Sequence, residues 1–365
     1  MDFDLLEQHL EAAGTPAYRR RQVYTAVTQT LVGDYASMTT LPKDLREKLA
    51  KKVPFSTVKV DHEESSDDGS VKLRLLTHDN FPIEAVLMRF ETRSKTSSER
   101  GERFTACLSS QSGCALACTF CATGAMGLGR NLTRFEIFDQ FLMLARSRGA
   151  AGGRIDNVVM MGMGEPFHNY DEVLAACRLM NDDDGVNLAA RRIAISTVGW
   201  IPGIDRLGKE DIQVKLALSL HAPNDEIRSE LMPVTKRYPV AELMAACRRY
   251  RRETHRRIFI EYLMLDGIND KQEHARELAK LLGTEGFHVN LIAYNPTASN
   301  YVGSHEDTVT RFGRVLDEYG VRNSYRVSRG RDISAACGQL AAPLTEARKA
   351  ARAARTARAE QAASK

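Results

Sequence analysis

The chain of 365 residues is 43% hydrophobic and carries a formal net charge of +4. This length and apolar content are typical of a globular protein with one large and one smaller domain, and no run approaches the roughly 20 apolar residues of a membrane helix. The acidic start, Met1–Glu7, lacks the basic flank and apolar core of a signal peptide. Seven cysteines without regular spacing argue against a disulfide scaffold, so we expect a protein of the reducing cytoplasm. The small net charge leaves a nucleic-acid partner open.

Residues 1–52 are predicted to form a small helical module. Leu5, Leu6 and Leu10 recur at helical spacing, and further helices are expected after Pro16 and Pro42. The helix expected after Pro16 contains the run Arg19–Arg21, which lies between two tyrosines. This run is either a solvated helix face or a contact for an RNA backbone, whose phosphates attract positive side chains.

Residues 53–103 are predicted to be a β-extension followed by a linker. Val71–Leu76 and Ile83–Arg89 alternate between apolar and polar residues, as strands do. Glu84 interrupts an otherwise apolar strand, so it is either an exposed edge residue or an active-site group with a raised pKa. The polar stretch 91–103 is typical of a mobile linker.

From Phe104 onward, apolar strand-like runs alternate with helical ones. We expect strands near residues 104–109, 155–161, 191–197, 213–220, 257–265, 287–294 and 322–328. Helices are expected around residues 133–147, 170–180, 225–231, 239–254, 271–283 and 305–319. This alternation predicts a parallel sheet with crossover helices, closed or nearly closed into a partial (β/α) barrel. Active sites of such barrels lie at the C-terminal ends of the strands.

Three cysteines, Cys114, Cys118 and Cys121, are spaced so that one loop can bring their sulfurs to one metal centre. A [4Fe–4S] cluster usually takes four thiolates, so three would leave one iron open to a small molecule. A structural zinc ion would need a fourth Cys or His close by, and no such pair completes the set. The spacing therefore favours a cluster over zinc or three unrelated buried thiols.

Several separated motifs resemble those of a known family. The three-cysteine spacing resembles the radical S-adenosylmethionine (SAM) enzymes. The motifs Cys107–Cys114, Gly162–Pro166, Ser219–Asp225 and Ala336–Leu340 together resemble the RlmN/Cfr family of RNA adenine methyltransferases. The resemblance runs from about Met1 to Leu340. It implies an α/β fold with a partial (β/α)6-type radical SAM barrel and a small N-terminal helical accessory domain.

The chain is accordingly divided into four parts. They are a helical, RNA-contacting accessory domain (1–52), a β-extension and linker (53–103), the barrel (104–342) and a basic Ala-rich tail (343–365). The tail is expected to be an exposed helix or a disordered extension.

The resemblance also implies a cofactor site. Cys114, Cys118 and Cys121 would hold one [4Fe–4S] cluster. Contacts to SAM are implied for Gly164, Glu165, Ser196, Ser219, Leu220, His221 and Asn295. A glutamate can pair with the SAM ammonium group, and a neighbouring glycine lets the backbone approach closely. His221 would otherwise be a histidine satisfied within the core.

Two further cysteines receive catalytic roles through the resemblance. By residue type alone, Cys107 and Cys337 are small buried hydrophobes, as we expect for Cys177 and Cys247. The family implies instead that Cys337 takes a methyl group from one SAM, and that a radical derived from a second SAM activates this methyl group for addition to adenine. Cys107 then forms a transient disulfide with Cys337 and releases the product, while Glu84 is the implied proton acceptor.

The expected function is methylation at C2 of an adenosine in 23S ribosomal RNA, adenosine 2503 in the usual ribosomal numbering, with adenosine 37 of tRNA as a further substrate. Methylation at C8, as in Cfr-like enzymes that confer antibiotic resistance, is the alternative chemistry. Two more functions stay open: a non-catalytic RNA-binding iron–sulfur protein, and a different radical SAM reaction such as peptide modification. The expected function implies a flavodoxin or ferredoxin as electron donor, a thiol reductant, no membrane and a monomeric protein.

Overall fold

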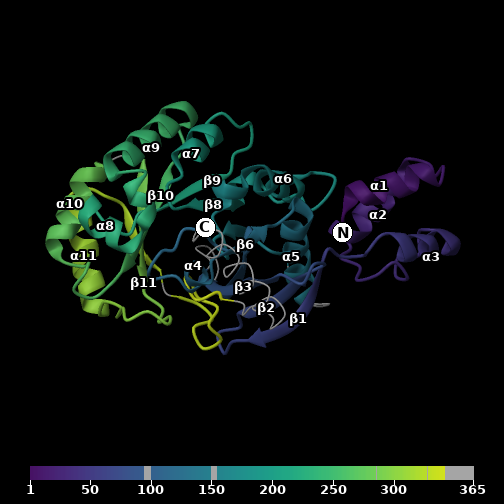
Figure 1. Cartoon of the computed structure of the whole chain (residues 1–365), viewed down its shortest axis with the longest axis horizontal. Helices are drawn as coiled ribbons and strands as arrows, with labels where there is room; N and C mark the ends of the chain where they lie inside the picture. The colour runs from purple at the N-terminus through teal and green to yellow at the C-terminus, as the bar shows by residue number, and fades with distance from the viewer. Residues whose placement is uncertain (94–99, 149–153, 285, 327, 342–365) are drawn as a thin grey trace, which may run out of the picture.

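The computed structural model describes residues 1–93, 100–148, 154–284, 286–326 and 328–341 (Figure 1). One ten-stranded sheet runs through the molecule in the order β1-β2-β3-β4-β7-β8-β9-β10-β11-β12. Its strands are β1 (Val58–Ser65), β2 (Val71–Thr77), β3 (Pro82–Arg93), β4 (Arg100–Cys107), β7 (Asn157–Met160), β8 (Ile193–Thr197), β9 (Lys215–Ser219), β10 (Ile258–Met264), β11 (Phe287–Ala293) and β12 (Asn323–Arg326).

The second part of the sheet is a partial barrel. In the sheet order from β4 and β7 to β12, each strand pairs in parallel with its neighbour. Helices follow the strands and cover the outside of the curved sheet (Figure 1). They are α5 (Arg134–Ser147), α6 (Tyr170–Asn181), α7 (Ile201–Leu207), α8 (Asp225–Leu231), α9 (Val240–Thr254), α10 (Gln272–Leu282) and α11 (Glu306–Glu318). The predicted radical SAM α/β fold is confirmed, although α7 was not among the predicted helices.

The first part of the sheet is an antiparallel extension of the same barrel. Strands β1, β2, β3 and β4 pair antiparallel in that order, so β3 has a neighbour on both sides. Glu84 lies on β3 opposite Arg74 of β2 and is only 5% exposed. The interpretation of Glu84 as an exposed edge residue is therefore wrong.

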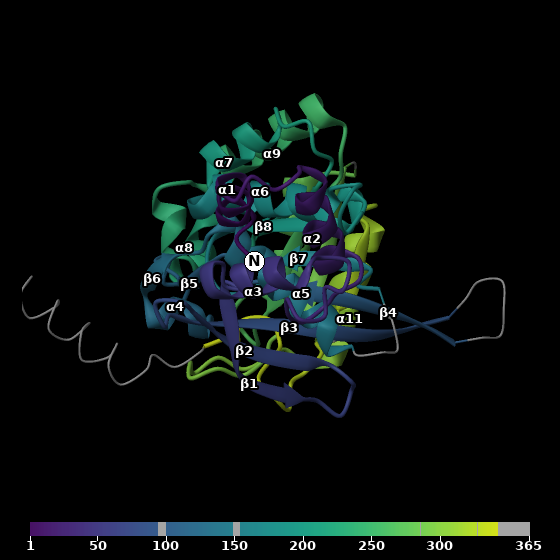
Figure 2. The same cartoon turned by 90° about the vertical axis from the view of Figure 1, so that its right-hand side faces the viewer.

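The stretch expected to be a mobile linker is largely a β-hairpin. Strand β3 continues to Arg93 and β4 begins at Arg100, with Phe90 opposite Arg103, while residues 94–99 lie outside the described part. The hairpin projects away from the body of the molecule (Figure 2). Because both of its faces meet solvent there, it needs no apolar alternation, which explains why the sequence resembles a linker.

The N-terminal helices α1 (Phe3–Ala12), α2 (Tyr18–Thr28) and α3 (Lys43–Lys52) form a small group at one edge of the molecule (Figure 1). Tyr24 of α2 donates a 2.7 Å hydrogen bond to Asp182, which follows α6. Within the arginine run, Arg20 pairs with Glu7 and Arg21 with Asp184, each at 2.9 Å. These contacts favour the helix-face interpretation of the run. The proposed domain boundaries stay predictions, and the tail beyond residue 341 lies outside the described residues.

Across the described residues, no helix is both long enough and apolar enough to cross a membrane.

Candidate active site

A cavity of about 600 Å³ occupies the inside of the barrel. One end lies at the C-terminal ends of the strands and is lined by Cys114, Cys118 and Cys121; we call it the cysteine end. Most of the residues predicted from the sequence line the same cavity, namely Cys107, Gly164, Glu165, Ser196, Ser219, His221 and Cys337. The structure thus gathers side chains from widely separated motifs at one place.

The cysteine loop is bracketed by a small hairpin that the sequence analysis missed. Strand β5 (Gln111–Gly113) precedes the loop, helix α4 (Ala122–Met126) follows it, and β6 (Leu128–Asn131) returns to pair with β5. Gly113 has a φ of +76°, and a Cβ there would lie 2.0 Å from the carbonyl oxygen of Gly127. Only glycine permits this close approach, which turns the chain into the loop.

The three thiols fit a [4Fe–4S] cluster. They are free, they line one cavity, and they come from one loop. Burial, together with the neighbouring charges of Glu165 and Cys121, raises the pKa of Cys114 to about 12. Buried thiols that repel one another as thiolates are stabilised in that form by a bound metal centre, which supplies the missing positive charge.

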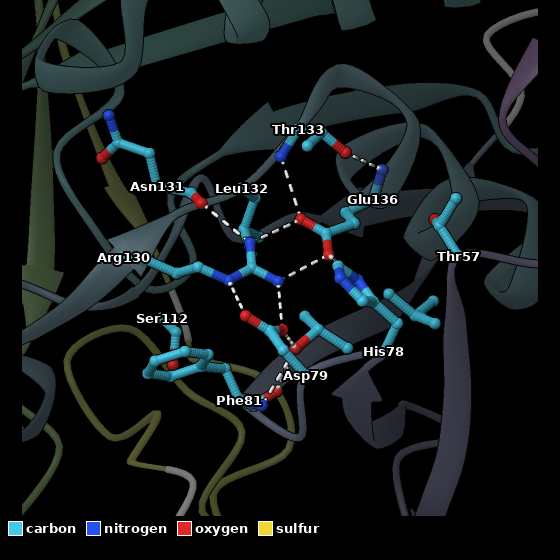
Figure 3. A network of polar contacts seen from close by, with 12 residues as sticks. Thr57, His78, Asp79, Phe81, Ser112, Arg130, Asn131, Leu132, Thr133 and Glu136 are labelled. Atoms are coloured by element: carbon cyan, nitrogen blue, oxygen red, sulfur yellow. Dashed lines mark hydrogen bonds and ion pairs between the residues drawn. The ribbon is translucent and has the colours of Figure 1, made fainter. Parts of the chain in front are cut away.

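Arg130 of β6 anchors the hairpin that carries the loop (Figure 3). Its guanidinium donates to Asp79 at 2.6 and 2.8 Å and to Glu136 at 2.7 and 2.8 Å. Asp79 lies in the turn between β2 and β3, while Glu136 closes a capping box with Thr133 at the start of α5. One side chain therefore ties the hairpin to both the antiparallel extension and the barrel.

The same carboxylates lie beside His78, and the potential ligand atoms of His78, Asp79 and Glu136 are all within 4.8 Å of one another. Figure 3 shows the guanidinium of Arg130 between the two carboxylates. Because Arg130 already supplies their positive charge and hydrogen bonds, this group does not qualify as a metal site.

The segment Gly162–Pro166 follows β7 and brings a carboxylate to the cavity. Gly164 has a φ of +102°, and a Cβ on it would lie 2.6 Å from the Cβ of Gln111. Glu165 accepts hydrogen bonds from the backbone N–H groups of Phe167 and Val198, each at 3.0 Å. Burial raises the pKa of Glu165 to about 7. A carboxylate has about four acceptor positions, so these two bonds leave capacity for an ammonium group.

His221 is held as a neutral donor. Its Nδ1 accepts a 3.0 Å hydrogen bond from the Leu263 N–H, so Nε2 carries the proton. Burial, with a smaller contribution from Arg228, lowers the pKa of His221 to about 3. The imidazole packs edge-on against Phe120 with ring centroids 4.9 Å apart. His221 is thus fixed in one tautomer while it lines the cavity.

Arg228 of α8 was missed in the sequence, although it follows the Ser219–Asp225 motif by three residues. It is fully buried and donates to the carbonyl oxygens of Val198 at 2.6 Å, Leu220 at 3.1 Å and Ser219 at 3.3 Å, and to Thr235 at 2.9 Å. These bonds join the C-terminal ends of β8 and β9. Arg228 therefore positions two strands that carry predicted SAM contacts.

The remaining predicted SAM contacts are divided. The hydroxyl oxygens of Ser196 and Ser219 lie 3.4 Å apart on neighbouring strands and line the cavity. Leu220 and Asn295 are buried but are not among the lining residues. The Asn295 amide donates to the Cys337 carbonyl oxygen at 3.3 Å, and its Oδ1 has no hydrogen-bond partner among the described residues.

Cys337 lies on a C-terminal segment that docks against the cysteine loop. The Ala122 N–H donates to the Gly338 carbonyl oxygen at 2.9 Å, and Thr123 donates to the carbonyl oxygen of Leu340. The thiol lines the cavity and is exposed there, so the expectation of a small buried hydrophobe is wrong for Cys337. Desolvation by the surrounding protein atoms raises its pKa to about 12. Burial, and then the nearby charge of Cys337, raises the pKa of Cys107 to about 12 as well. Both cysteines line the same cavity, and both are free thiols.

Glu84 does not reach the cavity lining. Its Oε2 accepts a 3.0 Å hydrogen bond from the Ala341 N–H, and its Oε1 lies 3.9 Å from the Lys72 ammonium nitrogen. Burial raises the pKa of Glu84. In this structure Glu84 binds the segment that carries Cys337 and does not face the cavity.

A second glutamate, Glu261 on β10, does line the cavity. Its Oε1 accepts from Asn290 at 2.7 Å, whereas Oε2 is buried without a hydrogen-bond partner among the described residues. Burial raises the pKa of Glu261. The sequence contains the same signal for Glu261 as for Glu84, namely a carboxylate inside an apolar strand.

The fold and the three-cysteine site define a radical SAM enzyme, and residues 108–281 match the model of the Radical SAM superfamily. Residues 1–54 match the model described as "Ribosomal RNA large subunit methyltransferase N-terminal domain". A crystal structure of a radical SAM methyltransferase from Sphaerobacter thermophilus is similar, with a TM-score of 0.87 and 46% identity over 93% of this chain and 97% of that one.

Two curated relatives are each described as a "Probable dual-specificity RNA methyltransferase RlmN". One from Thermus thermophilus is 45% identical and one from Chloroflexus aurantiacus is 44% identical, each over 93% of this chain and 92% of its own length. The chain therefore belongs to the RlmN family of radical SAM RNA methyltransferases. Enzymes of the radical SAM superfamily use a [4Fe–4S] cluster and SAM, as expected for this chain from its sequence.

Proposed function

We propose that this protein methylates C2 of adenosine 2503 in 23S ribosomal RNA, and C2 of adenosine 37 in tRNA, through a methylated Cys337. The observation that carries the proposal is that two free cysteines from distant parts of the chain, Cys107 and Cys337, face the cavity that the three-cysteine loop also lines. A pure RNA binder needs neither of them. The words "dual-specificity RNA methyltransferase" in the relatives' names support an RNA substrate of two kinds.

The two cysteines divide the work. Adenine C2 is electron-poor and cannot attack the methyl group of SAM directly. The Cys337 sulfur takes the methyl group first, as a thiolate, and releases S-adenosylhomocysteine. The bound cluster and a second SAM supply the radical chemistry that activates this methyl carbon. After the carbon has bonded to the base, the adduct must lose its unpaired electron and the ring proton. The Cys107 thiolate then attacks the Cys337 sulfur, the carbon–sulfur bond breaks, and the carbon keeps the electron pair and takes up a proton to become the methyl group. A disulfide is left for an external thiol to reduce.

The residues around SAM have separate tasks in this proposal. Glu165 pairs with the SAM ammonium group, and Gly164 lets the backbone approach the methionine part. Ser196, Ser219 and His221 supply neutral hydrogen bonds, since the Nε2–H of His221 remains available as a donor. Leu220 and Asn295 are proposed to contribute through the backbone and the buried amide.

Glu84 remains the proposed proton acceptor for the ring proton of adenine. Its carboxylate would first have to give up the hydrogen bond from the Ala341 N–H. Proton transfer by Glu84 is therefore coupled to movement of the segment that carries Cys337.

The proposal includes partners that this chemistry requires. The cluster needs an electron from a flavodoxin or ferredoxin, and the Cys107–Cys337 disulfide needs a thiol. Free thiols and an oxygen-sensitive cluster suit the cytoplasm, and we propose that the protein acts as a monomer.

Anaerobic reaction with unmodified 23S RNA, followed by mass spectrometry of the nucleosides, tests the proposal. We expect 2-methyladenosine from the wild type and none from Cys337→Ala. Formation of 8-methyladenosine would show that the enzyme methylates C8 instead of C2, and the proposed roles of the two cysteines would be unchanged. No methylated adenosine, with the cluster present and RNA bound, would reject the methyltransferase proposal.

A further inference from the structure

The cavity has a second end, at the N-terminal ends of the barrel strands. On β9, Lys215, Ala217 and Ser219 all line the cavity, as residues two apart on one face of a strand should. Ser219 lies near the cysteine end, and Lys215 is the first residue of the strand, roughly 13 Å away at the usual rise per residue.

The neighbouring strand repeats this arrangement. Arg192, which immediately precedes β8, lines the cavity together with Ala194 and Ser196. On both strands a serine faces the cysteine end, an alanine stands in the middle and a cation stands at the far end. The small alanine side chains leave the inside of the barrel open between the two ends.

Two further cations line the cavity: Arg103, in the first half of β4, and Arg326, which is the last residue of β12 and so lies at the C-terminal end of that strand. Because Arg326 pairs with Ile292 of β11, it is its long side chain that brings its charge toward the other three. We call this group of four cations the cationic mouth: Arg103, Arg192, Lys215 and Arg326. All four line the cavity, and the three arginines are exposed. Burial and the charges of the other three residues lower the pKa of Lys215, so each arginine is close enough to Lys215 to repel it.

The charges at the mouth are poorly compensated. Arg326 lies 3.8 Å from Glu261, but among the described residues no carboxylate forms an ion pair with Arg103, Arg192 or Lys215. Two of these cations contact aromatic rings instead: Arg103 lies 5.0 Å from the ring centroid of Phe90, and Lys215 lies 5.7 Å from that of Phe259. Like charges kept together without counter-charges cost free energy in the unbound protein, which an anionic ligand would recover.

We propose that RNA enters the barrel through the cationic mouth, with phosphates of the target nucleotide and its neighbours held by the four cations and the unstacked base directed across Ala194 and Ala217 toward Cys337. This inference rests on the proposed function and specifies how the substrate reaches the site. A base must leave its stack to enter such a pocket, and phosphate contacts from Arg and Lys position a nucleic acid while other groups read the base. Phe259 and Tyr325 line the same mouth and offer stacking surfaces.

Two other ligands fit the mouth less well. SAM carries an ammonium, a sulfonium and one carboxylate, so its net charge is positive and the four cations repel it. An acidic electron-donor protein would match the charge, but it would dock at the end of the cavity farthest from the cysteines that hold the cluster. The arginines of α2 are a weaker candidate for the main RNA contact, because Arg20 and Arg21 already have carboxylate partners.

The test compares the double variant Arg192→Gln/Lys215→Gln with the matched control Arg276→Gln/Arg311→Gln, which removes two exposed cations from α10 and α11 on the outside of the barrel. RNA affinity is measured against salt concentration on the full-length, cluster-loaded protein with a 23S RNA fragment. Each lost phosphate contact lowers the slope of log affinity against log salt by about 0.7 to 0.9. We expect the slope of the mouth variant to fall by about 1.5 and its KM for RNA to rise about tenfold or more, with the control unchanged.

Iron content and thermal melting establish that each variant is folded and loaded. The charge-conserving variant Arg192→Lys/Lys215→Arg should keep the wild-type slope even if the double Gln variant folds poorly. An unchanged slope in a folded Gln variant, or an equal change in the control, would overturn the inference. So would a variant that binds RNA normally but is reduced more slowly by flavodoxin, since the mouth would then dock an acidic protein. Failure of the proposed function is distinguishable, because the wild type would then bind RNA with this salt dependence and form no methyladenosine.

Discussion

Arg228 and Arg192 stand near opposite ends of one barrel and show how differently its two ends are built. Arg228 is fully buried, and its guanidinium donates to four oxygens of neighbouring segments. Arg192 is exposed at the cationic mouth, where the described residues give it no ion pair. Around Arg228 the cysteine end is held together by internal hydrogen bonds, whereas the charges of the mouth stay available for a ligand. An arginine without internal partners therefore tells more about binding than one whose donors are all used.

Replacing Arg228 should have the largest effect on stability. Arg228→Met leaves the carbonyl oxygens of Val198, Ser219 and Leu220 buried without this donor, and each unsatisfied buried group costs about 1 to 3 kcal/mol. We expect the free energy of unfolding to fall by about 3 to 5 kcal/mol in urea titrations, together with loss of SAM binding. A loss below about 1 kcal/mol would show that the hydrogen bonds of Arg228 contribute little to the stability of the cysteine end.

Gly164→Ala tests the rigidity of the same end at one backbone position. The φ of +102° is strained for alanine, and the added Cβ would meet the Gln111 side chain at 2.6 Å. We expect a destabilisation of about 2 kcal/mol and a clear loss of SAM affinity, measured by calorimetric titration. Gly267→Ala is a matched control, since its φ is +70° but nothing lies within 4 Å of the added Cβ. Equal loss of SAM affinity in both variants would contradict the proposed close approach.

The anchor of the cysteine loop gives a prediction about pH. Burial alone would raise the pKa of Asp79, but hydrogen bonds from Arg130 and Thr77 outweigh it and lower the pKa from 3.8 to about 2. A carboxylate with a lowered pKa stabilises the folded state at pH values above its ordinary pKa. This contribution disappears as the pH falls from about 4 to 2. Asp79→Asn should cost about 1 to 2 kcal/mol near pH 6, after allowance for solvent screening, and less below about pH 4. A stability difference that does not change with pH would contradict this assignment.

The smallest effect on stability is expected at the mouth. Arg192→Met removes an exposed charge that has no internal ion pair among the described residues, so the free energy of unfolding should change by less than about 0.5 kcal/mol. Relief of repulsion with Lys215 favours a slight gain. The same urea titration as for Arg228→Met measures it, and a loss above about 1 kcal/mol would mean that Arg192 is a structural residue.

The sequence predicted the parts of the site whose chemistry depends on residue type and short spacing. Cys114, Cys118 and Cys121 needed only one loop. The alternation of strands and helices was enough to place Glu165 after one strand and Ser219 at the end of another. It could not show that Arg192 and Lys215 face inward. Cations flank many strands, and only the folded barrel shows that the face shared with Ser196 and Ser219 stays open as far as these two residues. Strands buried on both faces lack the alternation that would have revealed their inner face.

The residues missed within the site share another cause. Arg228 contacts Val198, 30 residues away in the chain, and Glu261 contacts Asn290, 29 residues away. No local pattern distinguishes these two from ordinary charged residues. The β3–β4 hairpin resembles a linker in sequence because its outer part is polar on both faces. Glu84 is unusual in its strand, but its partner, the Ala341 N–H, lies 257 residues away.

The segment that carries Cys337 is attached to the antiparallel extension as well as to the cysteine loop. Lys72 of β2 donates to the Ile333 carbonyl oxygen at 2.6 Å, Ser66 donates to Asp332 at 2.6 Å, and Glu84 accepts from Ala341 at 3.0 Å. The extension and this segment therefore form one exchangeable unit in the engineering of chimeric enzymes. A barrel transplanted without β1, β2 and β3 would keep the cysteine loop and lose these three contacts to the segment of Cys337, whereas moving both pieces together would preserve them.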